Sequence, residues 1–137
     1  MPARNILGSL QLQIHIMRVL IADRSELIVQ RLEELLSEII FILGTGKAFS
    51  YEEAAELFKQ TKPDVVMMDM NLPDNSAYLL LKEIKTTSPR TVVIIMYIDK
   101  DEYVMKQCKK LGADFFFDKY HEFEKIPAVI NAIGSKS

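Results

Sequence analysis

The feature that most constrains the fold is a regular alternation of short apolar runs with segments of helical periodicity. Each run has the length of a buried strand and is nearly continuous in apolar residues, as in parallel strands covered on both faces. Chains of this kind build parallel sheets with right-handed crossovers. The sequence therefore predicts a three-layer α/β fold, with helices on both faces of a doubly wound, five-stranded parallel sheet. The predicted strands are Val19–Ala22, Ile39–Leu43, Asp64–Met70, Thr91–Tyr97 and Ala113–Lys119.

The segments between these strands carry the apolar spacing and the end signals of helices. Ser50 and Glu53 have the spacing of a capping box, which predicts that a helix begins there. Gly44–Gly46 is expected to be the turn that closes the second strand, and Gly112 to end the helix before the fifth strand. The predicted helices are Ser25–Ile39, Tyr51–Thr61, Ser76–Lys85, Lys100–Gly112, and a last one from near Pro127, or a turn earlier, to Ile133.

The length of the chain indicates one folded domain. It has 137 residues, of which 49% are hydrophobic, and it contains no internal repeat or linker. Residues 17–137 are expected to form the domain. Residues 1–16 lie outside the pattern, and Met17 directly precedes the first strand. This leader is therefore a disordered extension, a start upstream of the true one, or a tail that binds a partner.

Charge and composition argue against several classes of protein. A net charge of −2 does not suit a nucleic-acid surface, which needs clustered lysine and arginine. No apolar run is long enough to cross a bilayer, and the N-terminus is a poor signal peptide. A single cysteine, Cys108, excludes an internal disulfide framework, and a lone helical cysteine is more often inert than redox-active. These observations favour a cytoplasmic protein that binds neither nucleic acid nor membranes.

Polar side chains follow the carboxyl ends of several predicted strands. Ligands of open parallel sheets bind at this edge. Asp23 follows the first strand and Asp69 the apolar part of the third, while Tyr97 and Lys119 end the fourth and fifth. Asp69 on its own is equally well explained as a solvated strand end. The convergence of two carboxylates and an ammonium from separate strands nevertheless favours a functional site.

Four stretches, "VLIADRSE", "PDVVMMDMNLPD", "GADFFFDK" and "FEKIPAVINAI", resemble the receiver domain of bacterial two-component response regulators. The resemblance extends from about Met17 to Ile133, and "PDVVMMDMNLPD" is its most specific element. It implies a flavodoxin-like fold with the strand order 2-1-3-4-5. It also implies that Asp69 accepts a phosphoryl group from a histidine kinase or a phosphotransfer protein.

The resemblance assigns roles to further residues. Asp23, Asp69 and the backbone carbonyl of Asn71 correspond to ligands of Mg²⁺. Lys119 matches the lysine that contacts the phosphoryl oxygens, and Phe116 takes the position of the mobile aromatic switch residue. The chemistry fits these residue types, because attack of a carboxylate on an anionic phosphoryl group needs nearby positive charge. The resemblance implies no cofactor other than Mg²⁺.

Three departures from the family pattern bear most directly on the site. Arg24 stands where the family usually has a second acid, which should weaken Mg²⁺ binding. Arg24 either pairs with Asp69 or its phosphoryl group, or faces solvent without a role. Tyr97 replaces the Thr or Ser of the switch and is too long for the same short contact. Ile98 stands where a small residue usually leaves access, so both side chains are expected to crowd the site.

Three functions follow from these observations. The first is a single-domain phosphoacceptor that is not an enzyme, beyond its own phosphorylation and dephosphorylation. No output domain follows, so its signal would pass to a downstream protein, or to a homodimer, through the face of the fourth helix, fifth strand and last helix. The second is a pseudo-receiver that binds partners without phosphorylation. The third and most remote is a small phosphohydrolase of the haloacid-dehalogenase type, suggested only by "DMN" after an apolar strand.

Overall fold

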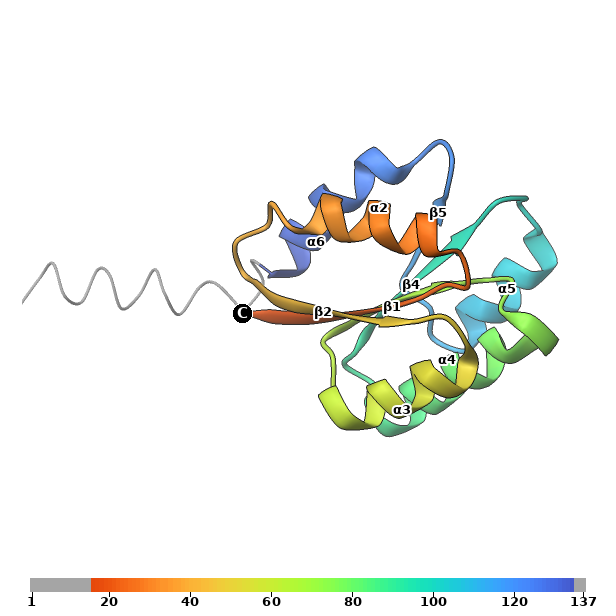
Figure 1. Cartoon of the computed structure of the whole chain (residues 1–137). Coiled ribbons are helices and arrows are strands. Elements are labelled where there is room, and N and C mark those ends of the chain that lie inside the picture. Colours follow the sequence, from red (N-terminus) through yellow and green to blue (C-terminus); the bar gives the residue numbers. More distant parts are fainter. Residues whose placement is uncertain (1–15, 135–137) are drawn as a thin grey trace, which may run out of the picture.

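The computed structural model describes residues 16–134, which form a five-stranded parallel sheet between two layers of helices (Figure 1). The strand order, β2-β1-β3-β4-β5, is the predicted flavodoxin-like order. The predicted leader, residues 1–16, lies outside the described residues except for Ile16. The strands are β1 (Met17–Ala22), β2 (Ile42–Ala48), β3 (Val65–Asp69), β4 (Val92–Tyr97) and β5 (Phe115–Asp118).

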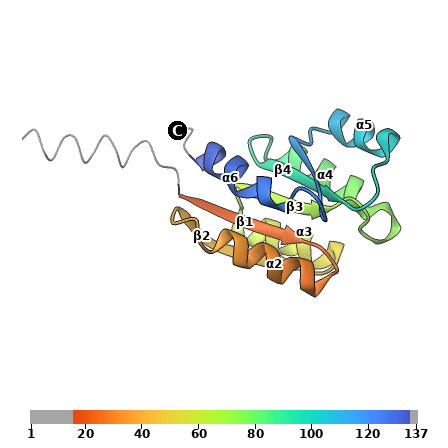
Figure 2. The ribbon, with the colours of Figure 1, turned by 90° about the horizontal axis from the view of Figure 1, so that it is seen from above.

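Helices cover both faces of the sheet (Figures 1 and 2). One face packs against α2 (Glu26–Leu36) and α6 (Ile126–Gly134), and the other against α3 (Tyr51–Thr61), α4 (Ser76–Thr87) and α5 (Glu102–Lys110). Short 3₁₀ turns, η1 (Pro73–Asn75) and η2 (Phe123–Lys125), precede α4 and α6. None of the helices in residues 16–134 has the length and apolar character needed to span a membrane.

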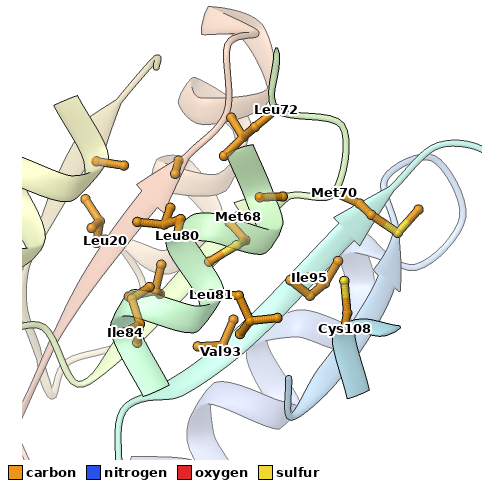
Figure 3. Close-up of a cluster of buried hydrophobic side chains, with 14 of the residues drawn as sticks. Leu20, Met68, Met70, Leu72, Leu80, Leu81, Ile84, Val93, Ile95 and Cys108 are labelled. Atoms are coloured by element: carbon orange, nitrogen blue, oxygen red, sulfur yellow. The ribbon is translucent and has the colours of Figure 1, made fainter. Parts of the chain in front are cut away.

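The two faces of the sheet carry separate apolar cores. Alternate side chains of each strand point to opposite faces, so Met67 lies in the core under α2 and α6, and Met68 in the core under α3, α4 and α5. Figure 3 shows the second core, in which Leu80 and Leu81 of α4 pack against Met68 and Ile95 of the sheet. Both methionines are fully buried.

The prediction for the second strand was wrong. The residues predicted as strand, Ile39–Leu43, and the predicted turn, Gly44–Gly46, were placed too early, because β2 runs from Ile42 to Ala48 and contains both glycines. β2 lies at the edge of the sheet and is half exposed, so it lacks the continuous apolar run of a central strand. The register with β1 shifts between Met17 and Arg18, and this irregularity leaves Leu43 outside the pairing.

The predicted helix signals are confirmed. Ser50 Oγ accepts a hydrogen bond from the Glu53 backbone N–H at 3.1 Å, and Glu53 Oε1 accepts one from the Phe49 N–H at 2.7 Å. Ser25 caps α2 by accepting from the Ile28 N–H. Gly112 follows α5 with a φ of 106°, a left-handed conformation that favours glycine. These local signals place the ends of the helices and so the polar loops at the carboxyl edge of the sheet.

Candidate functional site

The structure brings Asp23, Asp69 and Lys119 together at the carboxyl edge of the sheet. β1 and β3 are neighbours, with Ala22 paired to Met68, so the two acids that follow these residues lie side by side. Lys119 follows β5, and its backbone N–H donates to the Tyr97 carbonyl at 2.8 Å. The side chains are nearly enclosed, since Asp23 is 1% exposed, Asp69 6% and Lys119 3%.

The ammonium of Lys119 is shared between the two carboxylates. Its Nζ lies 2.5 Å from Asp23 Oδ2 and 3.2 Å from Asp69 Oδ1. A buried charge without a partner is costly, so this shared ammonium explains how an acid can end an apolar strand. The carboxylates also accept backbone hydrogen bonds, from the Ser25 N–H to Asp23 and from the Asn71 N–H to Asp69, each at 2.9 Å.

The pKa of Asp23 reflects this enclosure. Burial is the largest effect and raises the pKa of the Asp23 carboxyl above its ordinary value, and the nearby charge of Asp69 raises it further. The hydrogen bonds from Lys119 and from the Ser25 N–H act in the opposite direction. The net effect is a raised pKa of Asp23, so burial of the site disfavours the ionised form of this carboxyl.

The two oxygens of Asp69 differ in their surroundings. Oδ1 forms the ion pair with the Lys119 ammonium and accepts a hydrogen bond from the Asn71 N–H. Oδ2 makes no hydrogen bond or ion pair within residues 16–134. Asp69 therefore has one oxygen held in place and one available to an incoming group.

The donor set for a metal is small but fits Mg²⁺. Asp23 and Asp69 both contact the same nitrogen of Lys119, so their oxygens converge on one point. Mg²⁺ commonly binds one or two carboxylates and completes its shell with waters. Asn71, which is exposed, could add its backbone carbonyl. In the described part of the chain, no cluster of three or more acidic, histidine or cysteine side chains could hold a metal. A cation here would thus compete with Lys119 for the two carboxylates.

The residues predicted to modify the site lie at its rim. Arg24 is exposed and, among residues 16–134, forms no ion pair with Asp69. The cation that contacts the Asp69 carboxylate in this structure is Lys119. Ile98 is 42% exposed beyond the end of β4.

Tyr97 is buried and is directed toward the loop that follows β5. Only 8% of it is exposed, and its hydroxyl donates to Glu122 Oε1 at 3.4 Å. Burial, first, and then the negative charges of Glu122 and Asp118 raise the pKa of the Tyr97 phenol. Phe116 is half-buried against the same core as Tyr97. The hydroxyl thus bonds to Glu122 and not to Asp69.

The sequence did not point to Glu122. Its carboxylate also accepts the Asp118 N–H and the Lys125 ammonium, each at 3.0 Å. The bond from the Asp118 N–H, followed by that from Lys125, holds the pKa of Glu122 below its ordinary value. An acid a few residues beyond Lys119 forms no recognisable motif, so no sequence signal could have identified this contact.

Cys108 has the inert character expected of it. It is fully buried in the core under α3, α4 and α5. Burial raises the pKa of its thiol to about 11, which keeps the thiol protonated at neutral pH.

Comparison with known proteins identifies the family. The model of the response regulator receiver domain matches residues 19–131. Protein CcdB of Bacillus subtilis is 30% identical over 85% of this chain and 98% of its own length. Chemotaxis protein CheY of Halobacterium salinarum is 34% identical, covering 85% and 92%. The receiver domain of Francisella response regulator 1452 superposes with a TM-score of 0.74 at 26% identity, covering 85% and 95%. This chain belongs to the response regulator receiver domain family of two-component signalling.

Proposed function

We propose that this chain is a single-domain receiver that accepts a phosphoryl group on Asp69 and signals in the cytoplasm by contact with other proteins. The donor is a histidine kinase or a phosphotransfer protein. The observation that carries the proposal is the state of Asp69, a nearly buried carboxylate whose Oδ1 lies 3.2 Å from the Lys119 ammonium. Apart from its own phosphorylation and dephosphorylation, this site performs no catalysis.

In the proposed step, Asp69 Oδ2 attacks the phosphorus of a phosphohistidine. An oxygen–phosphorus bond forms and the phosphorus–nitrogen bond breaks. The electron pair remains on the imidazole nitrogen, which takes up a proton. The Lys119 ammonium and the Asn71 N–H hold Oδ1 and so aim Oδ2 outward. Lys119 also places positive charge where the phosphoryl oxygens arrive.

Mg²⁺ fits this site through Asp23, Asp69 and the Asn71 carbonyl. Receiver domains generally bind Mg²⁺ where they are phosphorylated. When bound, such a cation neutralises the charge of the phosphoryl oxygens. Arg24 replaces an acid near these ligands, so we expect weaker binding than a site with three acids gives.

The proposed signal leaves through the face formed by α5, β5 and α6. The domain is expected to exchange between two conformations. A new phosphoryl charge shifts this equilibrium only if it interacts more favourably with one conformation than with the other. Phe116 and Tyr97 pack in the core between the sheet and α5. This core therefore connects the carboxyl edge of the sheet, where Asp69 lies, to α5. A downstream protein, or a second copy of the chain in a homodimer, would respond to a change at this face.

A small acyl-phosphate donor tests the acceptor directly. With Mg²⁺ and acetyl phosphate, the wild-type protein should gain the mass of one phosphoryl group, and Asp69→Asn should gain none. Asp74→Asn is the matched control, because Asp74 is an exposed acid in the same loop. Undiminished incorporation in Asp69→Asn would exclude Asp69 as the acceptor.

The second candidate is a pseudo-receiver that binds partners without phosphorylation. The sharing of Lys119 by both carboxylates favours it, since the ammonium offsets part of their negative charge without a metal. The bond between Tyr97 and Glu122 favours it too, because the hydroxyl is engaged away from Asp69. Amide NMR with Mg²⁺ and beryllofluoride separates the two candidates. Shifts from Asp69 to Phe116 support the phosphoacceptor, whereas an unchanged spectrum supports the pseudo-receiver.

A further inference from the structure

The outer edge of β2 is open to a further strand. β2 is the first strand of the sheet and pairs with β1 alone among the strands of residues 16–134. Alternate N–H and C=O groups along its outer side therefore have no strand partner. Exposed edge strands are usually kept short or protected by charges and prolines. β2 has seven residues, contains no proline, and carries one charged side chain, Lys47.

One face of β2 is polar. On the side of α2, the ammonium of Lys47 lies 3.5 Å from Glu33 Oε1. Thr45 lies on the same side, because its hydroxyl donates to Glu33 Oε2 at 3.2 Å. The single charge of β2 thus belongs to this face and leaves the opposite face unprotected.

The opposite face of β2 is bare backbone. A Cβ added to Gly46 would lie 3.4 Å from the side chain of Leu20 and 4.0 Å from that of Leu57 in α3, so this face lies on the side of α3. A Cβ added to Gly44 would meet no atom within 4 Å. This glycine face, defined as Gly44 and Gly46, therefore has room for the larger apolar side chains of a neighbouring strand.

Exposed apolar side chains gather where β1 and β2 begin. Ile40 is 94% exposed, and Ile16 and Leu43 are each exposed by more than half. The Met17 N–H donates to the Phe41 carbonyl at 2.9 Å, so the residues that lead into the two strands are neighbours. Several large apolar side chains exposed at one end of a sheet are typical of an interaction surface.

The segment that leads into β1 has the pattern of a strand. The stretch "LQLQIHI", residues 10–16, alternates strictly between apolar and polar side chains. Such alternation predicts a strand with one apolar face. The stretch is as long as β2 and continues into Met17 without a proline or glycine. Its apolar residues are Leu10, Leu12, Ile14 and Ile16.

We infer that residues 10–16 pair antiparallel with the outer edge of β2 in a second copy of the chain. The leader continues the line of β1 beyond the amino edge of its own sheet. A two-fold axis perpendicular to the sheet places the partner's β2 beside this leader, and the partner's leader beside the first copy's β2. Both β2 edges are then covered, so the assembly closes as a dimer. Ile40 lies near the axis in each copy and is covered there.

The faces of the two strands match in this arrangement. In β1, Leu20 and Ala22 point to the core under α3, and Val19 and Ile21 to the core under α2. Continued along the chain, this alternation directs the apolar residues of the leader to the α3 side. A two-fold axis perpendicular to the sheet keeps that side the same in both copies. The apolar residues therefore cover the partner's glycine face, and the polar residues meet its polar face.

The leader of the same chain fits the edge of β2 less well. β2 itself lies between β1 and that edge, so the chain would have to cross two strand spacings, about 10 Å, just before Met17. This crossing would use Ile14 to Ile16 and break the alternation. Pairing between the two leaders alone would leave β2 and Ile40 uncovered.

This inference is independent of the proposed function. β2 and β5 lie at opposite edges of the sheet, so the dimer leaves the proposed signalling face open. Asp69→Asn should dimerise as the wild type does. Failure of phosphorylation would refute the proposed function and leave this inference standing, whereas failure of dimerisation would refute this inference alone.

Sedimentation of the full chain over a range of concentrations tests the dimer. The wild type should show a monomer–dimer equilibrium. Leu12→Glu/Ile14→Glu, which charges the apolar face of the leader, should raise the dissociation constant at least about tenfold. Gln11→Glu/Gln13→Glu makes the same charge change on the polar face and should alter it less than about threefold.

A variant of β2 and a mixing experiment test the strand exchange. Gly44→Glu charges the glycine face where a side chain has room, and should also weaken the dimer at least about tenfold. An equimolar mixture of Gly44→Glu and Leu12→Glu/Ile14→Glu restores one intact leader–β2 pairing in two. Native mass spectrometry with one variant labelled with ¹⁵N should therefore detect a heterodimer at concentrations where each variant alone is monomeric.

Four results would overturn the inference. The first is a wild type that stays monomeric at every concentration. The second is an equal loss of dimer in Leu12→Glu/Ile14→Glu and Gln11→Glu/Gln13→Glu. The third is a Gly44→Glu variant that dimerises as the wild type does, which would assign the contact to the leaders alone. The fourth is a mixture without heterodimer. Circular dichroism of each variant shows that the fold is retained.

Discussion

Replacing Lys119 with methionine should destabilise the protein by an unusually large amount for a single lysine. The substitution keeps the length of the side chain but removes the ammonium that lies 2.5 Å from Asp23 and 3.2 Å from Asp69. Two carboxylates that are 1% and 6% exposed are then left without a cation. Breaking a buried pair in this way costs about 3–5 kcal/mol of unfolding free energy at neutral pH.

The cost should depend on pH in a defined direction. The pKa of Asp23 is already raised by burial, and loss of Lys119 removes an effect that lowers it. A carboxyl with a raised pKa in the folded state stabilises that state below the unfolded pKa, and this contribution is lost as pH rises through the folded pKa. The deficit of Lys119→Met is therefore largest at neutral pH and becomes smaller as the pH falls through the raised pKa of Asp23.

Urea denaturation followed by circular dichroism measures this deficit. Lys125→Met is the control, because its ion pair with Glu122 is exposed and should contribute less than about 1 kcal/mol. Adding Asp23→Asn to Lys119→Met should recover part of the loss, because one uncompensated carboxylate is removed. The reasoning fails if Lys119→Met costs no more than Lys125→Met, or if its cost does not change between neutral and mildly acidic pH.

Two further predictions concern the rim of the site. Arg24→Asp changes the formal charge of residues 23, 24 and 69 from −1 to −3, and should tighten Mg²⁺ binding on the order of tenfold in an NMR titration. Arg90→Asp, at an exposed position outside the site, should not, and equal affinities in the two variants would exclude a role for Arg24. Tyr97→Phe removes only the 3.4 Å hydrogen bond to Glu122 and should cost less than about 1 kcal/mol of stability while shifting the Glu122 amide. An unshifted Glu122 amide would show that the contact is not formed in solution.

The central strands were predictable and the edge strand was not, for a physical reason. β3 is buried on both faces, so its composition alone marks it as a strand. β2 pairs on one side only and exposes much of its surface, so glycine and polar residues are tolerated within it. Its Gly44–Gly46 stretch therefore has the composition of a turn, although it continues the strand.

The sequence predicted which residues form the site, but not every hydrogen bond and ion pair that they make. Strand ends in a parallel sheet meet at one edge, so the proximity of Asp23, Asp69 and Lys119 follows from topology. Which cation compensates the acids depends on side-chain directions that spacing does not encode. We expected positive charge from Lys119 and a metal, with Arg24 as a further candidate, and in the structure Lys119 contacts both carboxylates. The hydrogen bond between Tyr97 and Glu122 could not be predicted for the same reason.

The attachment of Tyr97 to the Lys119 loop at two points links two distant surfaces. The carbonyl of Tyr97 accepts the Lys119 N–H, and its hydroxyl donates to Glu122. Its ring lies in the core against which Met105 of α5 packs. A protein that displaces this loop must therefore disturb the packing beneath α5. Because coupling between binding sites is reciprocal, a protein bound at α5 and a ligand bound beside Lys119 would change each other's affinity by the same factor.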